Sequence, residues 1–333
     1  MNVLKWIDDM RFSEKKKAMP VLSFPSIQLM NISVTDLISD SEKQAKGMKA
    51  IADRVNSAAA VSMMDLSVEA ECFGSEIRFS DDEVPTVIGG IVSSEEEVNA
   101  LKVPEVGTGR TGIYIDAMKK AVEIIKDRPV FAGGIGPFSL AGRLMDVTEA
   151  MIYCYDEPDM VHALLEKVTS FIIKYCKAYK NIGANGIVIA EPLAGLLSPA
   201  LADEFSSRYV KKIVDELQDE SFAVIYHNCG NATIQMIDSL LSIKAAAYHF
   251  GDAIDMTEMM THIPEDVVAM GNISPANEFR NGTVESITKA TRDLLGKCTK
   301  YPNFVISSGC DIPPMSKWEN IDAFFNTVDE FYS

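Results

Sequence analysis

The chain has 333 residues, 47% of them hydrophobic, and a formal charge of −17 at pH 7. That length and apolar content allow a large buried core in one α/β domain. The negative charge argues against nucleic-acid binding, because phosphate contacts depend on clustered Lys and Arg. Apolar runs such as 58–64 are too short to span a bilayer, and residues 1–12 lack the apolar core of a signal peptide. We therefore expect a single domain over 1–333 that is cytoplasmic and binds neither nucleic acid nor membranes.

Eight short apolar runs alternate with longer amphipathic stretches. The runs are 20–25, 58–66, 129–137, 186–192, 222–230, 245–252, 267–275 and 304–312. Helical patterns cover 35–56, 113–126, 140–180, 199–218, 231–242, 283–299 and 317–332. Apolar strands separated by helices indicate a parallel sheet that is covered on both faces, and eight such units predict an α/β fold of the (β/α)8 TIM-barrel type. Residues 67–112 are irregular, and we expect them to form a hairpin-like insertion after the second strand.

Polar residues end several of the expected strands, where a TIM barrel carries its active site. His227 and Cys229 are two positions apart in one strand, so their side chains project to the same side. Cys310 ends the last strand and can converge with them. Two thiolates and one imidazole form a catalytic zinc set with one coordination position open. A buried histidine and two buried cysteines without a metal remain the alternative.

Such a zinc ion would favour sulfur chemistry. Two anionic ligands neutralise Zn²⁺ and make it a poor generator of hydroxide, whereas a thiol bound to it loses its proton. The bound thiolate remains nucleophilic in a site of negative charge. The ligand set therefore predicts alkylation of a thiol rather than hydrolysis.

Two carboxylates are candidate catalytic residues. Glu191 could occupy the open zinc position or accept the thiol proton, or it could cap a loop. Asp65 could act in catalysis or order the mouth of the barrel through backbone amides. His249 is interpreted as structural.

Three further residues are candidates for binding substrate. Arg143, expected early in the helix over 140–180, could pair with a sulfonate or a corrinoid side chain, or lie at the surface. Asn231 is expected to start a helix whose amides could bind an anion. Asn272 could contact substrate or serve the strand-end turn.

The chain resembles the uroporphyrinogen decarboxylase superfamily over nearly its whole length. The matching stretches are 64–87, 133–146, 183–199, HNCGNAT (227–233), GNISP (271–275) and 307–320. The arginine-rich RQAGRY signature of true decarboxylases is absent, since residues 20–31 read PVLSFPSIQLMN. Gly309-Cys310-Asp311 stands where decarboxylases have a G-H-G turn, while Asp65 matches their pyrrole-binding aspartate.

The H-x-C motif and the distant G-C pair resemble the methylcobalamin:coenzyme M methyltransferases of that superfamily. The resemblance implies that His227, Cys229 and Cys310 bind zinc. It also implies that a partner protein carries the methylated corrinoid (cobalamin) that donates the methyl group to a small thiol such as coenzyme M. Open alternatives are a donor:corrinoid methyltransferase that demethylates a methoxy, methylamine or halomethane compound, another acceptor such as tetrahydrofolate, a uroporphyrinogen decarboxylase, and a zinc- or corrinoid-binding protein without turnover.

Overall fold

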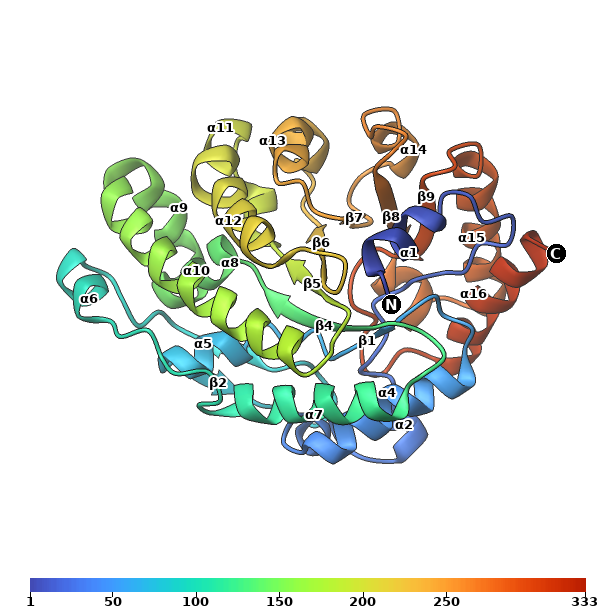
Figure 1. The fold of residues 1–333 in the computed structure, drawn as a ribbon, viewed down its shortest axis with the longest axis horizontal. Coiled ribbons are helices and arrows are strands. Elements are labelled where there is room, and N and C mark those ends of the chain that lie inside the picture. The colour runs from blue at the N-terminus through green and yellow to red at the C-terminus, as the bar shows by residue number, and fades with distance from the viewer.

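The structure, a computed structural model of residues 1–333, is built around a curled parallel sheet of seven strands (Figure 1). Its order is β1-β4-β5-β6-β7-β8-β9. The bounds are Ala60–Val61 (β1), Val130–Ile135 (β4), Gly186–Ala190 (β5), Ala223–Asn228 (β6), Ala247–Phe250 (β7), Val268–Ile273 (β8) and Phe304–Ser308 (β9). The predicted α/β architecture with a parallel sheet is confirmed, and each of these strands falls inside a predicted apolar run.

The strand expected at 20–25 is not formed, so the sheet has seven strands rather than eight. Pro20 and Pro25 lack the N–H groups that a ladder needs. The segment just before and around Pro20 nevertheless bridges the two edges of the sheet. Met19 N donates to Ile306 O of β9 at 3.0 Å, and Ala58 N donates to Ala18 O at 2.8 Å directly before β1.

The strands separate two hydrophobic cores, because alternate side chains point to opposite faces of a sheet. Inside the curl, 16 buried residues pack together, among them Phe131, Ile225 and Val305, and α1 (Val3–Asp9) covers this core with Val3 and Ile7. Outside it, 83 buried residues fill the layer between the strands and the helices. The inner core occupies the end where the strands begin, so inward side chains at the other end are free to be polar.

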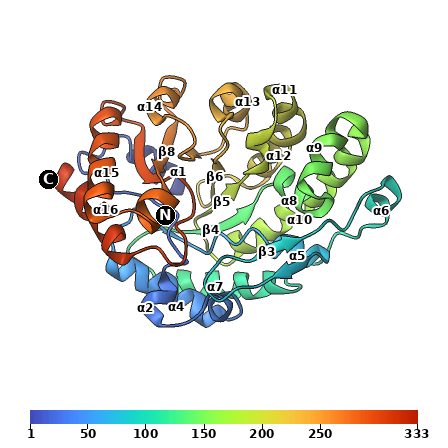
Figure 2. The same ribbon diagram turned by 180° about the vertical axis from the view of Figure 1, so that it is seen from behind.

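Helices surround the sheet in both views (Figures 1 and 2). Those before β5 are α2 (Ser26–Met30), α3 (Val34–Ile38), α4 (Ser41–Arg54), α5 (Val68–Phe73), α6 (Glu95–Ala100), α7 (Arg110–Ile124), α8 (Pro137–Met145), α9 (Val147–Asp156) and α10 (Pro158–Asn181). Those after it are α11 (Pro199–Ala202), α12 (Arg208–Leu217), α13 (Ile237–Ser242), α14 (Met256–Met259), α15 (Val284–Cys298) and α16 (Trp318–Phe331).

The single helix expected over 140–180 is divided into α8, α9 and α10. Asp146 has a positive φ of 79° and ends α8, and its side chain caps α9 by accepting from Thr148 N at 3.0 Å. Pro158 then begins α10, as proline favours the first turn of a helix. Arg143 therefore lies in the last turn of a short helix and not early in a long one.

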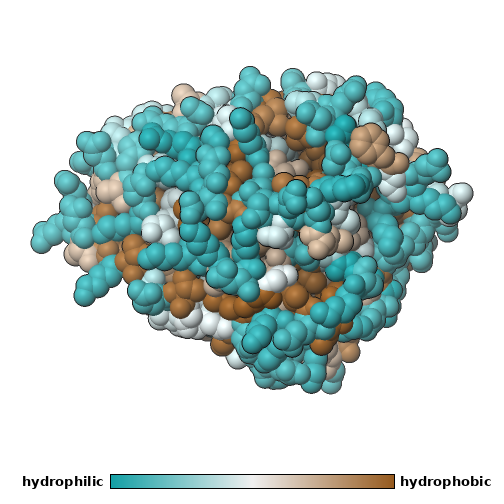
Figure 3. All heavy atoms as spheres, viewed as in Figure 1, coloured by the Kyte–Doolittle hydropathy of each residue, from teal (hydrophilic) through white to brown (hydrophobic).

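Between β1 and β4, β2 (Glu76–Arg78) and β3 (Thr86–Ile88) form a separate antiparallel pair. No helix of the molecule combines the length and apolarity that crossing a membrane requires. Hydrophilic residues dominate the face that carries α1, with apolar atoms visible between them (Figure 3).

Candidate metal centre

Three inward-facing strand ends meet at the carboxyl end of the curled sheet. Ile225 of β6 belongs to the inner core, and His227 follows it by two positions on the same face. The same two-residue step leads from Ala247 to His249 in β7 and from Val305 to Ser307 in β9. His227 pairs directly with His249 in the register of β6 and β7. A polar layer therefore replaces the apolar one at this end.

His227, Cys229 and Cys310, which we call the triad, meet beside this layer. Their ligand atoms all lie within 4.8 Å of one another. The Nε2 atom of His227 is buried and has no hydrogen-bond partner, and neither cysteine is in a disulfide. A buried polar atom without a partner is costly, so this nitrogen needs a ligand. The donors fit a zinc ion, for which two sulfurs and one imidazole nitrogen leave a fourth position open.

The triad favours a negative charge on sulfur. Interaction with the Cys310 thiol, and with the nearby His227 ring, lowers the pKa of the Cys229 thiol well below its ordinary value. The same interaction and burial raise the pKa of Cys310 well above its ordinary value. A bound cation would remove the remaining thiol proton, because metals bind thiolates.

Asn228, which the sequence analysis missed, holds the loop that carries Cys229. This fully buried amide donates to Glu191 O at 3.2 Å and accepts from Gly230 N and the Thr233 hydroxyl, both at 2.9 Å. Gly251 at the end of β7 packs against the same loop, and a Cβ there would lie 2.5 Å from the Cβ of Cys229. A buried polar residue between His227 and Cys229 was the available signal for this role.

Glu191 lies outside the triad and caps the N-terminus of α8. Its carboxylate accepts from Phe138 N and Ser139 N, both at 2.9 Å, and from the Ser139 hydroxyl at 2.7 Å. Burial raises its pKa to about 7, because the three hydrogen bonds only partly offset the loss of water. The carboxylate thus fixes the helix that carries Arg143.

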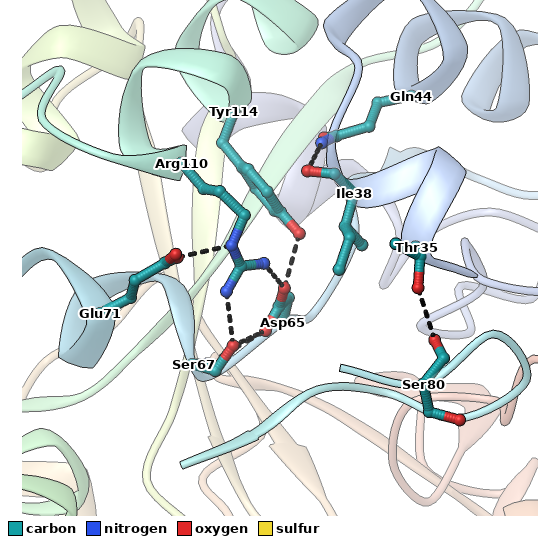
Figure 4. A network of polar contacts seen from close by, with 9 residues as sticks. All are labelled: Thr35, Ile38, Gln44, Asp65, Ser67, Glu71, Ser80, Arg110 and Tyr114. Carbon is teal, nitrogen blue, oxygen red and sulfur yellow. Dashed lines mark hydrogen bonds and ion pairs between the residues drawn. The ribbon is translucent and has the colours of Figure 1, made fainter. Parts of the chain in front are cut away.

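Asp65 lies at the centre of a saturated network, which we call the Asp65 network (Figure 4). Its carboxylate accepts from Ser67 N at 3.1 Å, from the Tyr114 hydroxyl at 2.8 Å and from the Arg110 guanidinium. Arg110 also donates to Glu71 at 2.5 Å. The Asp65 side chain is fully buried, and that of Arg110 is 7% exposed. The network joins the loop after β1 to α5 and α7.

A cavity of ≈ 330 Å³ opens beside Cys310. Two of the candidate residues from the sequence, Arg143 and Cys310, line this cavity. Arg143 is partly buried, forms no ion pair, and leaves its Nε without a partner. Arg280, which also lines the cavity, is paired with Glu83 at 2.6 Å. The cavity therefore joins one cysteine of the triad to one arginine without an ion pair. Another cavity, of ≈ 300 Å³, lies at the far end of the sheet near Trp6 and Lys16.

The two asparagines have different surroundings. Asn272 in β8 donates from its amide to Gly251 O at 2.8 Å and to Ile254 O at 2.9 Å, so it braces the loop after β7. Asn231 is exposed and lies in a turn, while the helical turn that follows begins at Thr233. The expectation that Asn231 starts this helix is wrong, because Asn228 and Thr233 hold a turn there.

Residues 16–331 match the uroporphyrinogen decarboxylase (URO-D) family. The chain is 30% identical over 291 residues to the methylcobamide:CoM methyltransferase MtbA of Methanosarcina acetivorans, covering 85% of this chain and 83% of that protein. It is 25% identical over 284 residues to the uroporphyrinogen decarboxylase of Coxiella burnetii, covering 82% and 77%.

The fold has a solved counterpart in a methyltransferase from Methanosarcina mazei, with a TM-score of 0.89, 22% identity and coverage of 100% and 99%. The matched segment spans the strands and the triad alike. The chain therefore belongs to the uroporphyrinogen decarboxylase (URO-D) family and, as its motifs predict, resembles the corrinoid methyltransferase branch of that family.

Proposed function

We propose that the protein moves a methyl group from a methylated corrinoid, carried by a partner protein, to the sulfur of a small anionic thiol such as coenzyme M. The observation that carries this proposal is the buried, unpartnered Nε2 of His227 beside two free cysteines. The similarity to the MtbA proteins, which are named methylcobamide:CoM methyltransferases, supports it.

The triad would hold one zinc ion through His227 Nε2 and the two cysteine sulfurs. The zinc ion would bind the acceptor thiol as a thiolate and keep that sulfur nucleophilic at neutral pH. The acceptor sulfur attacks the methyl carbon, the S–C bond forms as the Co–C bond breaks, and the electron pair stays on the corrinoid, which becomes Co(I). The acceptor proton leaves when the thiol binds.

The cavity beside Cys310 offers the second half of an acceptor site. A thiol bound at the triad would place its other end in this space, where Arg143 has an unpaired Nε. A guanidinium binds planar or tetrahedral oxyanions through several N–H groups. We propose that Arg143 binds the sulfonate of the acceptor.

The other candidate residues have supporting roles in this proposal. Glu191 fixes α8 and so the position of Arg143, while the proton-accepting role is left to solvent at the cavity. Asp65 shapes the mouth through Arg110, and Asn272 braces the loop beside Cys229. Asn231, in its exposed turn, remains a candidate contact for the partner or for substrate.

The test uses purified, zinc-reconstituted protein with methylcobalamin and coenzyme M under anaerobic conditions. We expect methylcobalamin to be consumed and methylated thiol to form, and both to stop when zinc is removed by a chelator. Thiol methylation that persists without zinc would contradict the proposal. Turnover only from a methylated donor to cob(I)alamin would assign the opposite half-reaction.

Uroporphyrinogen should not be decarboxylated. Its eight carboxylates need cationic partners, and residues 20–31 contain no Arg or Lys. Formation of coproporphyrinogen by the purified protein would overturn this part of the proposal.

A further inference from the structure

A chain of buried hydrogen bonds runs from the triad to the edge of the sheet. His227 Nδ1 lies 2.7 Å from His249 Nδ1 and 3.1 Å from His249 O. His249 Nε2 lies 2.7 Å from the Ser307 hydroxyl, which donates to Met19 O at 2.8 Å. His227 and His249 are each 2% exposed, and Ser307 is fully buried. Neither ring has a carboxylate among its hydrogen-bond partners.

The far end of this chain determines where each proton lies. Met19 O can only accept, so the single Ser307 hydroxyl proton points to it. Ser307 must then accept from His249 Nε2–H, which leaves a lone pair on His249 Nδ1. That lone pair and the carbonyl oxygen of His249 both face His227 Nδ1, so His227 Nδ1 carries the proton. In the neutral ring of His227 the lone pair is consequently on Nε2, the atom that has no partner in the protein.

We propose that His249 and Ser307 are positioning residues that hold His227 in the tautomer able to bind a metal through Nε2. This inference rests on the zinc site of the proposed function. Metal-bound histidines commonly donate their second N–H to a carboxylate, a carbonyl or water, which fixes the ring and its tautomer. Here a second imidazole, anchored by a serine, supplies that acceptor.

These hydrogen bonds also link the triad to the irregular segment at Pro20. Ser307 accepts from His249 and donates to Met19, while the Met19 N–H bonds to Ile306 of β9. The segment that replaces an eighth strand is thus attached to the residues that orient His227. An ordinary strand would have used the Met19 carbonyl in a ladder.

The direct test is the tautomer of His227 in the zinc-free wild-type protein. Selective ¹⁵N labelling of the four histidines and long-range ¹H–¹⁵N correlation spectra distinguish protonated from unprotonated ring nitrogens, with a His227→Gln variant for assignment. We expect His227 to be protonated at Nδ1 and unprotonated at Nε2. A proton on Nε2, or an equal mixture of tautomers, would overturn the proposal.

A second test measures zinc affinity by chelator competition. His249→Phe keeps the shape of the ring and removes its acceptor, and we expect zinc to dissociate about 10-fold more readily, the low end of the usual effect because the His249 carbonyl remains. Ser307→Ala should weaken zinc binding less, with His227 in a tautomer mixture by NMR. The control is His262→Phe at an exposed position, which should leave zinc binding unchanged.

Zinc binding by His249→Phe and Ser307→Ala as tight as that of wild type would refute the positioning role. These outcomes are separable from failure of the proposed function. If the wild type bound no zinc, the zinc site would be wrong, while the tautomer measurement on the zinc-free protein would still decide the hydrogen-bond chain. If zinc bound and Nε2 carried a proton, only the present inference would fail.

Discussion

The triad and the Asp65 network both gather buried polar groups after the strands end, but they use their hydrogen-bonding capacity differently. In the Asp65 network every carboxylate oxygen of Asp65 has partners, including Arg110 and Tyr114. In the triad the Nε2 of His227 has none, and neither cysteine is in a disulfide. Buried polar groups that have all their hydrogen-bond partners stabilise a fold. Buried metal-ligating atoms that lack partners indicate a ligand that the polypeptide itself does not supply.

The same contrast separates the triad from two acidic residues that the sequence analysis named as candidate catalytic groups. Glu191 and Asp65 follow strands of the same sheet, yet each accepts hydrogen bonds from backbone or side-chain donors. Their carboxylates position α8 and the loop after β1. We therefore expect their substitution to change stability first, and substitution of the triad to change metal binding first.

The largest expected effect is on methyl transfer when a triad cysteine is removed. Cys229→Ala and Cys310→Ala should each lower the rate from methylcobalamin to thiol by at least about 10³-fold, since a metal contributes several kcal/mol to such steps. Cys72→Ala is the matched control, because Cys72 is partly buried and outside the triad. If a triad variant kept wild-type turnover, the triad would not differ from the Asp65 network in its role in catalysis.

Breaking the Asp65 network should reduce stability while leaving zinc in place. Asp65→Asn leaves the buried Arg110 without its main partner, so we expect the free energy of unfolding to fall by about 3–5 kcal/mol. Glu71→Gln removes the more exposed partner and should cost less. Denaturant unfolding and zinc content of the same samples check both. Loss of zinc from a folded Asp65→Asn protein would mean that the regions are not independent.

The contribution of Glu69, which adjoins the Asp65 network, to the free energy of unfolding should depend on pH. Burial raises the pKa of Glu69 to about 8. The folded state then holds this proton more tightly than the unfolded state, so its contribution is fully present below the unfolded pKa and is lost as pH rises through the folded pKa. Wild type should lose up to about 3 kcal/mol relative to Glu69→Gln between pH 5 and pH 8.

Parallel pH curves for wild type and Glu69→Gln in denaturant titrations would contradict that expectation. Gln can still accept the Ile135 N–H that now binds Glu69 at 3.2 Å. The variant therefore removes the charge with little change in hydrogen bonding.

The smallest expected effect concerns selection among acceptors. Arg143→Gln should raise KM for coenzyme M by about 10-fold, the loss of one charge-assisted hydrogen bond, while leaving the uncharged thiol 2-mercaptoethanol unaffected. Arg280→Gln is the control in the same cavity, because the charge of Arg280 is already paired with Glu83. An equal rise in KM for both thiols would show that Arg143 does not bind the anionic group.

Strand positions could be predicted because the apolar runs are short and bounded by polar ends. The strand predicted at 20–25 was wrong for a local reason, because its two prolines cannot donate hydrogen bonds to a strand ladder. The break at Asp146 was also hidden, because a capping aspartate inside a long amphipathic pattern resembles an exposed helical residue.

The candidate site was predictable to the extent that strand geometry governs it. The two-residue spacing of His227 and Cys229 and the position of Cys310 followed from alternation, and the structure brings the three within 4.8 Å. The environments of Glu191, Asp65 and His249 did not follow, because their partners include residues 22 to 58 positions away. Hydrogen bonds between distant segments are set by packing, which the local pattern does not contain.

The most direct test of the central claim is the metal content of the purified protein. Wild type, prepared without chelator and then given excess zinc and desalted, should hold one zinc ion per chain, and Cys310→Ala treated in the same way should hold almost none. A folded wild-type protein that neither contains zinc nor takes it up would contradict the account.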